Sequence, residues 1–149
     1  MNLVENRRAR FDYEILETYE AGIVLDGGEV KSLRNGNANI TGSYIIIRPH
    51  GAELINCHIP PYQAKNTALE YKSDRTRRLL LNKKELEYLF GKAKEGGLTI
   101  VPLSIYTKGR RIKVSLGLGR HKKQHDKREV LKKRAVNKEI RRALKRSDE

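Results

Sequence analysis

The chain has 149 residues, a formal net charge of +14 and a single cysteine, Cys57. This length suits one domain with an appendage. No apolar stretch approaches the ~18 residues that a membrane span needs, and the charged N-terminal segment lacks the apolar core of a secretory signal, so we expect a cytoplasmic protein with no membrane partner. One cysteine excludes an intrachain disulfide, and its place between Ile55 and Ile59 favours a small buried side chain over a reactive thiol.

The first predicted elements are a long strand and a short helix. Residues 12–26 are rich in Tyr, Ile, Val and Leu interleaved with Glu, which predicts a strand, and Ala21-Gly22 predicts a bend or bulge within it. In residues 29–36 the apolar side chains fall on one side of a helical turn, and Asn35-Gly36 would end a short helix there. A first strand that curves strongly is typical of a small barrel.

A hairpin and a long loop come next. Residues 44–48 and 52–59 flank Pro49-His50-Gly51, which predicts two strands joined by a short turn. Pro60-Pro61 would end the second strand, because proline cannot donate to a ladder, and would open a polar loop over residues 62–76. A loop of this length is often functional.

The second half of the chain predicts a helix and another hairpin. Asn82 is a suitable helix start, apolar residues recur after it at helical spacing, and Gly96-Gly97 would end the segment. Residues 98–107 and 111–118 alternate apolar and polar side chains, as paired strands do. Five strands with one long helix before the last pair predict an all-β fold with small helices, an OB-type β-barrel over residues 1–119.

Residues 120–149 form a basic C-terminal tail with 13 Lys or Arg against 5 Asp or Glu. Val136, Ile140 and Leu144 would place only a thin apolar stripe on a helix. Such a segment buries too little surface to offset its ordering entropy, so we expect it to be disordered or frayed alone and helical when docked. A solvated basic tail is one interpretation; binding to RNA or DNA is the other, because each neutralised phosphate releases counterions.

Few residues suggest catalysis or metal binding. His50 lies in a predicted turn and His58 ends a predicted strand. His121 and His125 have helical spacing beside Asp126, but lysines crowd them and no second ligand pair is available, so we predict no metal site. No specific phosphate loop and no converging nucleophile and base occur, so we predict neither a cofactor nor an enzyme.

A second basic cluster follows the long loop. It comprises Lys72, Arg75, Arg77, Arg78, Lys83 and Lys84. Cations in the first turn of a helix oppose its dipole, so phosphate binding explains Lys83 and Lys84 better than helix stability does, with a solvated rim as the alternative. The tyrosines Tyr62, Tyr71 and Tyr106 would either stack on bases or pack in the barrel wall.

Five segments carry a family resemblance in chain order. They are NRRARFDYEILETYEAGIVL (6–25), GEVKSLRNGNANITGSY (28–44), HIPPY (58–62), RTRRLLLNKKEL (75–86) and HKKQHDKRE (121–129). Together they resemble the SmpB family, the transfer-messenger RNA (tmRNA) binding proteins of bacterial trans-translation. The resemblance implies a monomeric, non-enzymatic RNA-binding adaptor with an OB barrel and a C-terminal tail.

The resemblance also implies partners for the two parts of the chain. In the family the barrel grips the tRNA-like domain of tmRNA, and the complex, delivered together with the elongation factor EF-Tu, enters a ribosome stalled on mRNA that lacks a stop codon. The tail then occupies the empty mRNA channel at the decoding centre, against small-subunit ribosomal RNA.

Individual residues can be carried over position by position, all but Lys113 from within the five segments. The RNA-binding residues implied by the resemblance are Glu20, Lys31, Arg34, Leu80, Asn82 and Lys113, and the decoding-centre residues of the tail are His125, Asp126, Lys127 and Arg128. Glu20 is the unusual member: a carboxylate is costly beside phosphates but can accept from a base amine or a 2′-hydroxyl, or orient a neighbouring lysine, and a plain surface glutamate is the alternative.

Two hypotheses of another kind stay open at this point. A structural ribosomal or general nucleic-acid-binding barrel would share the charge and the strand order, and a modest excess of unrelated RNA would compete with its ligand. A metal-dependent nuclease is the enzymatic alternative, and intact RNA after long incubation with divalent metals would exclude it.

Overall fold

The structure, a computed structural model, describes residues 1–63 and 70–147. The side chains at positions 124–126, 130 and 146–147 also lie outside the description. The elements in chain order are β1 (Asn2–Glu5), α1 (Arg7–Asp12), β2 (Tyr13–Ile23), α2 (Gly27–Arg34), β3 (Tyr44–Arg48), β4 (Gly51–Ile55), β5 (Arg77–Leu80), α3 (Lys83–Ala93), β6 (Leu98–Lys108), β7 (Arg111–His121) and α4 (Gln124–Ser147).

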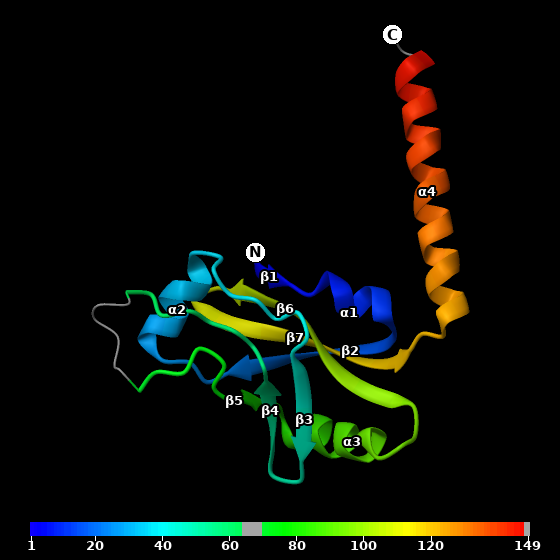
Figure 1. Cartoon of the computed structure of the whole chain (residues 1–149). Helices are drawn as coiled ribbons and strands as arrows, with labels where there is room; N and C mark the ends of the chain where they lie inside the picture. Colours follow the sequence, from blue (N-terminus) through cyan, green and yellow to red (C-terminus); the bar gives the residue numbers. More distant parts are fainter. Residues whose placement is uncertain (64–69, 148–149) are drawn as a thin grey trace.

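The described strands form one antiparallel sheet in the order β1-β6-β7-β2-β5-β4-β3. Strands β2, β6 and β7 have 11 residues each and make the long central part of the sheet (Figure 1). Strand β3, at one end of this order, also contacts β6 near the other end. The sheet therefore curls round on itself, which confirms the predicted OB-type architecture.

The interior of the barrel is filled by alternate residues of the strands. Ala21 of β2 lies opposite Val114 of β7, and both are almost fully buried. Ile105 of β6, Leu54 of β4 and Leu33 of α2 join the same apolar cluster. Because successive side chains of a strand point to opposite faces, the sequence neighbours of these residues face outward.

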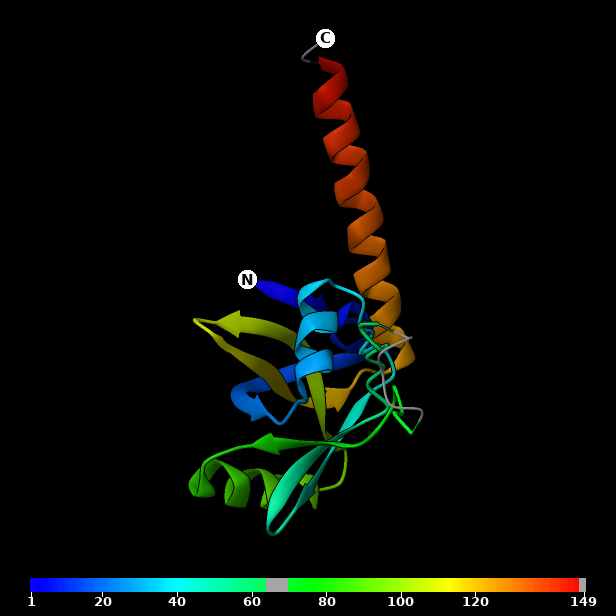
Figure 2. The ribbon, with the colours of Figure 1, turned by 90° about the vertical axis from the view of Figure 1, so that its left-hand side faces the viewer.

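Two helices begin at well-formed caps. The side chain of Asp26 accepts from the Glu29 N–H at 2.8 Å, and the Glu29 carboxylate accepts from the Asp26 N–H at 3.0 Å, which is a capping box at the start of α2. Asn82 caps α3 by accepting from the Glu85 N–H at 2.8 Å, as the sequence predicted. Helix α3 contacts β3 and β6 and lies along one end of the barrel (Figure 2).

Two details of the predicted strands are wrong. The irregularity in β2 falls between Ile15 and Glu17, not at Ala21-Gly22. Strand β4 ends at Ile55, because Asn56 adopts a φ of +60°, which turns the chain out of the ladder. The following Cys57 is nevertheless fully buried, as predicted, and burial raises the pKa of its thiol to about 11.

Three short elements were not predicted from the sequence. Strand β1 has four residues and depends on pairing with β6. Helix α1 has six residues and begins at Asn6, whose side chain accepts from the Ala9 N–H at 3.1 Å. Strand β5 has four residues, two of them arginines, and pairs with β2 and β4. Each is too short for a periodic pattern, and its partners lie far away in the sequence.

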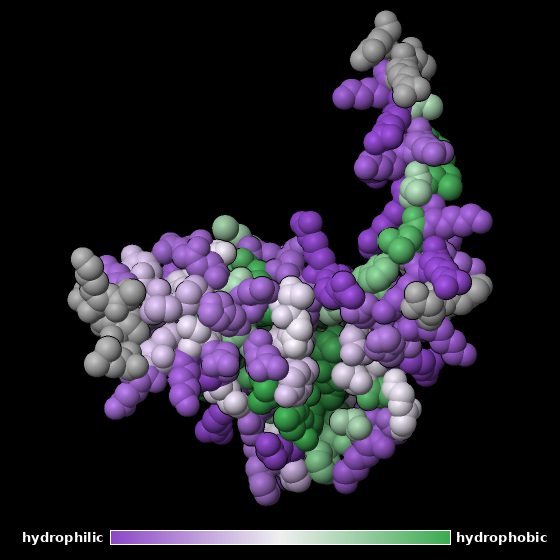
Figure 3. All heavy atoms as spheres, viewed as in Figure 1, coloured by the Kyte–Doolittle hydropathy of each residue, from purple (hydrophilic) through white to green (hydrophobic). Residues whose placement is uncertain are grey.

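Most of the predicted basic tail is helix α4, which projects away from the barrel beside α1 (Figure 1). The predicted boundary at residue 120 is displaced, because Arg120 and His121 are the last residues of β7. The sequence of α4 contains neither glycine nor proline and is rich in Lys and Arg, which favour helices. The tail is thus helical in the chain by itself, where the sequence predicted a disordered or frayed segment and a helix only on docking. Its thin apolar stripe is uncovered: Val136 is 48% and Ile140 52% exposed (Figure 3).

Candidate nucleic-acid interface

Three neighbouring strands place the predicted barrel residues on one outward face. Gly22 of β2 lies opposite Leu80 of β5 on one side and opposite Lys113 of β7 on the other. Glu20 precedes Gly22 by two residues and so shares its face. A Cβ on Gly22 would lie 3.3 Å from the Cβ of Leu80, so the glycine gives the leucine room over the strand. We call Glu20, Leu80 and Lys113 the strand row.

Leu80 is the apolar member of the strand row. Its side chain is 55% exposed although the adjacent Leu79 is buried. Asn82 follows two residues later and uses its side-chain oxygen to cap α3, while its amide also carries two N–H donors. An exposed leucine beside an amide and a lysine offers apolar contact, hydrogen bonding and positive charge within a short distance.

Glu20 is already engaged by two neighbouring side chains. The Tyr106 hydroxyl donates to its carboxylate, and Lys108 Nζ lies 3.2 Å from Oε1. Hydrogen bonds from Tyr106 and then from Lys108 lower the pKa of Glu20, so this exposed carboxylate is ionised at neutral pH. Burial and the bond to Glu20 raise the pKa of Tyr106 to about 12. Glu20 therefore orients Lys108 and Tyr106 beside Lys113.

Lys31 and Arg34 lie on the exposed side of α2, apart from the strand row. Arg34 Nη2 donates to the carbonyl of Arg110 at 3.5 Å, which connects the end of α2 to the turn between β6 and β7. Lys108, which binds Glu20, is the last residue of β6 and directly precedes that turn. Lys31 Nζ lies 5.5 Å from the ring centroid of Tyr62, which is itself exposed.

The predicted basic cluster is divided by the structure. Arg77 is fully buried and donates through Nε to Glu29 Oε2 at 2.7 Å, and Arg75 Nε donates to the same oxygen at 3.1 Å. Burial raises the pKa of Glu29, but hydrogen bonds from Arg75, the Asp26 N–H and Arg77 outweigh it and hold the pKa below its usual value. The prediction of a phosphate-binding cluster is therefore wrong for Arg77, whose guanidinium is buried against Glu29, whereas Arg75 also binds Glu29 but keeps 35% of its side chain exposed.

The other members of the basic cluster stay at the surface. Lys72, Arg78, Lys83 and Lys84 are exposed. Tyr71 belongs to the buried network, because its hydroxyl donates to the carbonyl of Ile59 at 2.7 Å. Of the three tyrosines left open by the sequence, only Tyr62 presents an exposed ring that no hydrogen bond in the described residues holds.

The predicted tail residues lie in the first turn of α4, at the opposite end of β2 from the strand row. Arg128 is exposed, and the side chains of His125 and Asp126 are outside the described part of the chain. Lys127 has a partner in the barrel domain: its Nζ lies 2.8 Å from Asp12 Oδ1, at the end of α1. Sequence reasoning missed this pair, because no local pattern connects positions so far apart.

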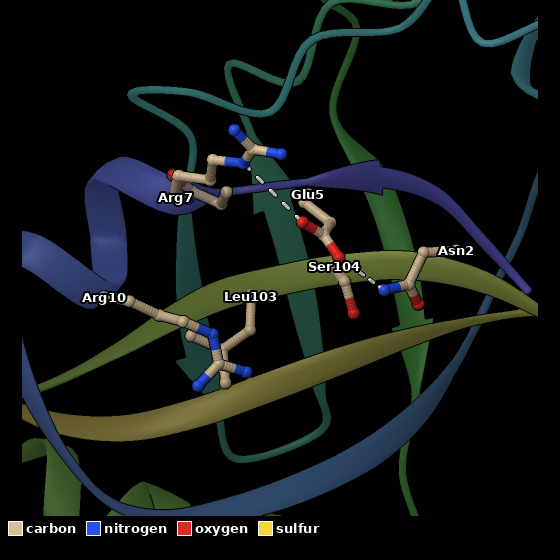
Figure 4. A pocket seen from close by; sticks show the side chains of 7 residues that line it. Asn2, Glu5, Arg7, Arg10, Leu103 and Ser104 are labelled. Carbon is tan, nitrogen blue, oxygen red and sulfur yellow. Dashed lines mark hydrogen bonds and ion pairs between the residues drawn. The ribbon is translucent and has the colours of Figure 1, made fainter. Parts of the chain in front are cut away.

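Neither a candidate metal site nor a membrane-spanning helix occurs in the described part of the chain. They contain no group of three or more His, Cys, Asp or Glu placed to hold a metal ion, and no helix among them is long and apolar enough to cross a membrane. A small cavity of about 80 Å³ lies between α1 and β6 (Figure 4). Its polar groups pair with one another, since Glu5 accepts from Asn2 Nδ2 at 2.6 Å and lies 3.8 Å from Arg7 Nε.

Comparisons with known proteins show which chains and structures this one is similar to. A family model described as SmpB protein matches residues 3–146. An SsrA-binding protein of Gloeothece citriformis is 51% identical over 144 residues, covering 97% of this chain and 93% of the relative. One from Thermosynechococcus vestitus is 52% identical over 143 residues, covering 96% and 94%. A solved structure described as "tmRNA-SmpB: a journey to the center of the bacterial ribosome" matches with a TM-score of 0.67 and 50% identity over 85% of this chain and 92% of that one.

Proposed function

The chain belongs to the SmpB family, and we propose on this basis that it binds the tRNA-like domain of tmRNA and delivers it to ribosomes stalled on mRNA without a stop codon. The observation that carries the proposal is identity of about half over nearly the whole length to SsrA-binding proteins. The matched tmRNA-SmpB structure supports the same partners. We assign tmRNA binding to residues 1–119 and the ribosomal mRNA channel to residues 120–149.

The strand row suits recognition of a folded RNA by shape. Structured RNA is contacted chiefly through phosphates, sugars and exposed base faces. Lys113 supplies charge for a phosphate, the exposed Leu80 an apolar surface for a sugar or base, and Asn82 hydrogen bonds. Glu20 contributes by fixing Lys108 and Tyr106 and by offering an acceptor to a 2′-hydroxyl.

Helix α2 extends this surface with positive charge. Lys31 and Arg34 are exposed, and Arg34 contacts the turn that follows Lys108. The buried Glu29 and Arg77 hold α2 against the start of β5. Binding through several such cations falls steeply with salt, since each neutralised phosphate releases counterions.

The tail suits a channel with walls of RNA. Residues 120–149 carry a formal charge of +8, as 13 basic residues minus 5 acidic ones. At the decoding centre, His125 would stack on a base and Arg128 would neutralise phosphate, with Asp126 and Lys127 in the same turn. The uncovered apolar stripe around Ile140 would pack against the channel wall.

We further propose that the protein is an adaptor without catalytic activity of its own, acting as a monomer in the bacterial cytoplasm, where ribosomes are. EF-Tu would take part in the delivery complex. The chemistry of tagging would then belong to tmRNA and the ribosome, since among the described residues the interface gathers lysine, leucine, asparagine and tyrosine and no nucleophile with an adjacent base.

Competition binding tests the proposal against a general nucleic-acid-binding barrel. Labelled tmRNA is bound to the protein at near-physiological salt and challenged with unlabelled tRNA, ribosomal RNA fragments or tmRNA. We expect a hundredfold mass excess of unrelated RNA to leave most of the complex intact. The same hundredfold excess of unlabelled tmRNA should displace the labelled tmRNA. Displacement by a modest excess of unrelated RNA would instead support the general binder.

A further inference from the structure

The base of α4 is held against α1 by an ion pair that is largely shielded from water. Lys127 Nζ lies 2.8 Å from Asp12 Oδ1, and each side chain is only 18% exposed. On the other oxygen of the same carboxylate, Arg8 Nε donates to Oδ2 at 3.1 Å. The carboxylate thus sits between one cation of its own helix and one cation of the tail.

An aromatic ring supplies a second contact on the same side of α4. Lys127 Nζ and Arg134 Cζ each lie 5.7 Å from the ring centroid of Phe11. Lys127 and Arg134 are separated by seven residues, which is two helical turns, so they project from one side of α4. Two contacts spaced along a helix fix its direction, whereas one contact would fix only its position.

The backbone just before α4 is tied to the same place. The Lys122 N–H donates to the Asp12 carbonyl at 2.8 Å, and Lys122 Nζ donates to the Arg10 carbonyl at 3.3 Å. Asp12 therefore holds the tail through both its backbone and its side chain. We call Phe11, Asp12, Lys127 and Arg134 the joint.

Lys127 is less exposed than its neighbour Arg128. Arg128 is exposed, as is every other described side chain of α4 except Lys127, Arg134 included. A cation that is shielded from water and paired at 2.8 Å is poorly placed to take up a phosphate, because it would first have to leave its carboxylate.

The direction of α4 matters because the two RNA sites are far apart. Strand β2 runs from Tyr13, directly after α1, to Gly22 in the strand row, roughly 30 Å along an extended strand. Helix α4 has 24 residues and spans about 36 Å. A tilt of about 20° at the joint would displace the far end of α4 by roughly 12 Å, which is about the width of a helix.

Resting on the proposed function, we propose that Asp12 and Lys127 are positioning residues that set the direction of the tail relative to the tmRNA-binding surface. Lys127 acts through Asp12 and not by binding ribosomal phosphate. The joint keeps the tail aligned with the mRNA channel while the strand row, at the other end of β2, holds tmRNA.

A charge swap separates the two roles of Lys127. The test variants are Asp12→Lys, Lys127→Asp and the double variant that combines them. The matched controls are Arg128→Asp alone and Arg128→Asp combined with Asp12→Lys, which make the same charge changes at an exposed position. Each is measured for tagging rate on stalled ribosomes, for tmRNA affinity and for thermal stability. Dyes on His50→Cys and Lys145→Cys report the distance between barrel and tail.

We expect Asp12→Lys and Lys127→Asp each to slow tagging about tenfold, with tmRNA affinity within about twofold of wild type and a changed dye distance. The double variant should recover most of the rate and the wild-type distance, whereas Asp12→Lys should not rescue Arg128→Asp. The proposed positioning role would be overturned if the double variant tagged as slowly as Lys127→Asp, or if Asp12→Lys tagged at the wild-type rate. A wild-type chain that neither binds tmRNA nor supports tagging would instead overturn the proposed function.

Discussion

Replacing Arg77 by methionine should destabilise the whole fold, because the buried carboxylate of Glu29 would lose the compensating charge that is buried beside it. Arg77 and Glu29 are both fully buried and lie 2.6 Å apart at their closest atoms. Arg77→Met keeps most of the side-chain volume but removes the guanidinium. Removal of one partner from a buried ion pair costs about 3–5 kcal/mol, because the other charge stays without compensation.

The structure places the expected loss at the lower end of that range. Glu29 keeps the hydrogen bonds from Arg75 and from the Asp26 N–H. The variant also loses the bonds from Arg77 to the carbonyls of Cys57, Ser73 (2.9 Å) and Arg75 (3.1 Å). We expect about 3 kcal/mol less free energy of unfolding, a large part of the 5–15 kcal/mol of an ordinary domain.

Urea denaturation followed by circular dichroism measures this loss, with Arg78→Met as the matched control. Arg78 is the exposed neighbour in β5, and its replacement should change the free energy of unfolding by less than about 0.5 kcal/mol. The double variant Glu29→Leu/Arg77→Met should be more stable than the sum of the single losses predicts. A loss below about 1 kcal/mol for Arg77→Met would refute the reasoning.

Three further predictions concern RNA binding, pH and the tail. Leu80→Ala should weaken tmRNA binding about tenfold in fluorescence anisotropy, since it removes the exposed apolar surface of the strand row; unchanged affinity would exclude Leu80 from the interface. Because the folded pKa of Glu29 lies below its unfolded value, its stabilising contribution is present above the ordinary Glu pKa of about 4.3 and is lost as the pH falls below it. Urea unfolding midpoints measured from pH 6 to pH 3 should fall with pH for the wild type and fall less steeply for Glu29→Gln. The same dependence of the midpoint on pH in both proteins would contradict the role of Glu29. Replacing Asp126, Lys127 and Arg128 together by alanine should abolish tagging on stalled ribosomes while tmRNA affinity stays within about twofold, and normal tagging would refute the tail assignment.

The sequence predicted those parts of the fold that have a local pattern. Helix α3 was predicted from the cap at Asn82 and the helical spacing behind it, and the structure begins the helix at the next residue. The long strands β6 and β7 were predicted from their alternating side chains. Strand β5 escaped prediction because its four residues include two arginines, and its partners β2 and β4 are distant in the chain.

Charge in the sequence did not reveal which cations face solvent. Arg75 and Arg77 resemble their neighbours Lys72 and Arg78 in the sequence, yet both bind a single glutamate in α2, and Arg77 is fully buried there. A helix-capping glutamate that also binds two arginines from a distant part of the chain produces no periodic pattern in the sequence. The pairing of Lys127 with Asp12 could not be predicted for the same reason.

The family resemblance identified the residues of the strand row but not their contacts. Glu20, Leu80 and Lys113 were assigned through family resemblance in separate segments, and the sheet brings them together on one face around Gly22. Their contact with RNA remains a prediction. The contacts of Glu20 with Tyr106 and Lys108 could be found only once the registers of β2 with β7 and of β7 with β6 were known.

Sequencing of the RNA that copurifies from a bacterial lysate tests the central claim most directly. The protein is captured at moderate salt, and bound RNA is extracted and counted against total cellular RNA. A tmRNA adaptor predicts one dominant species, tmRNA, enriched far above its cellular share and depleted by Leu80→Ala. Recovery of ribosomal RNA, tRNA and mRNA in proportion to their abundance, without enrichment of tmRNA, would contradict the account.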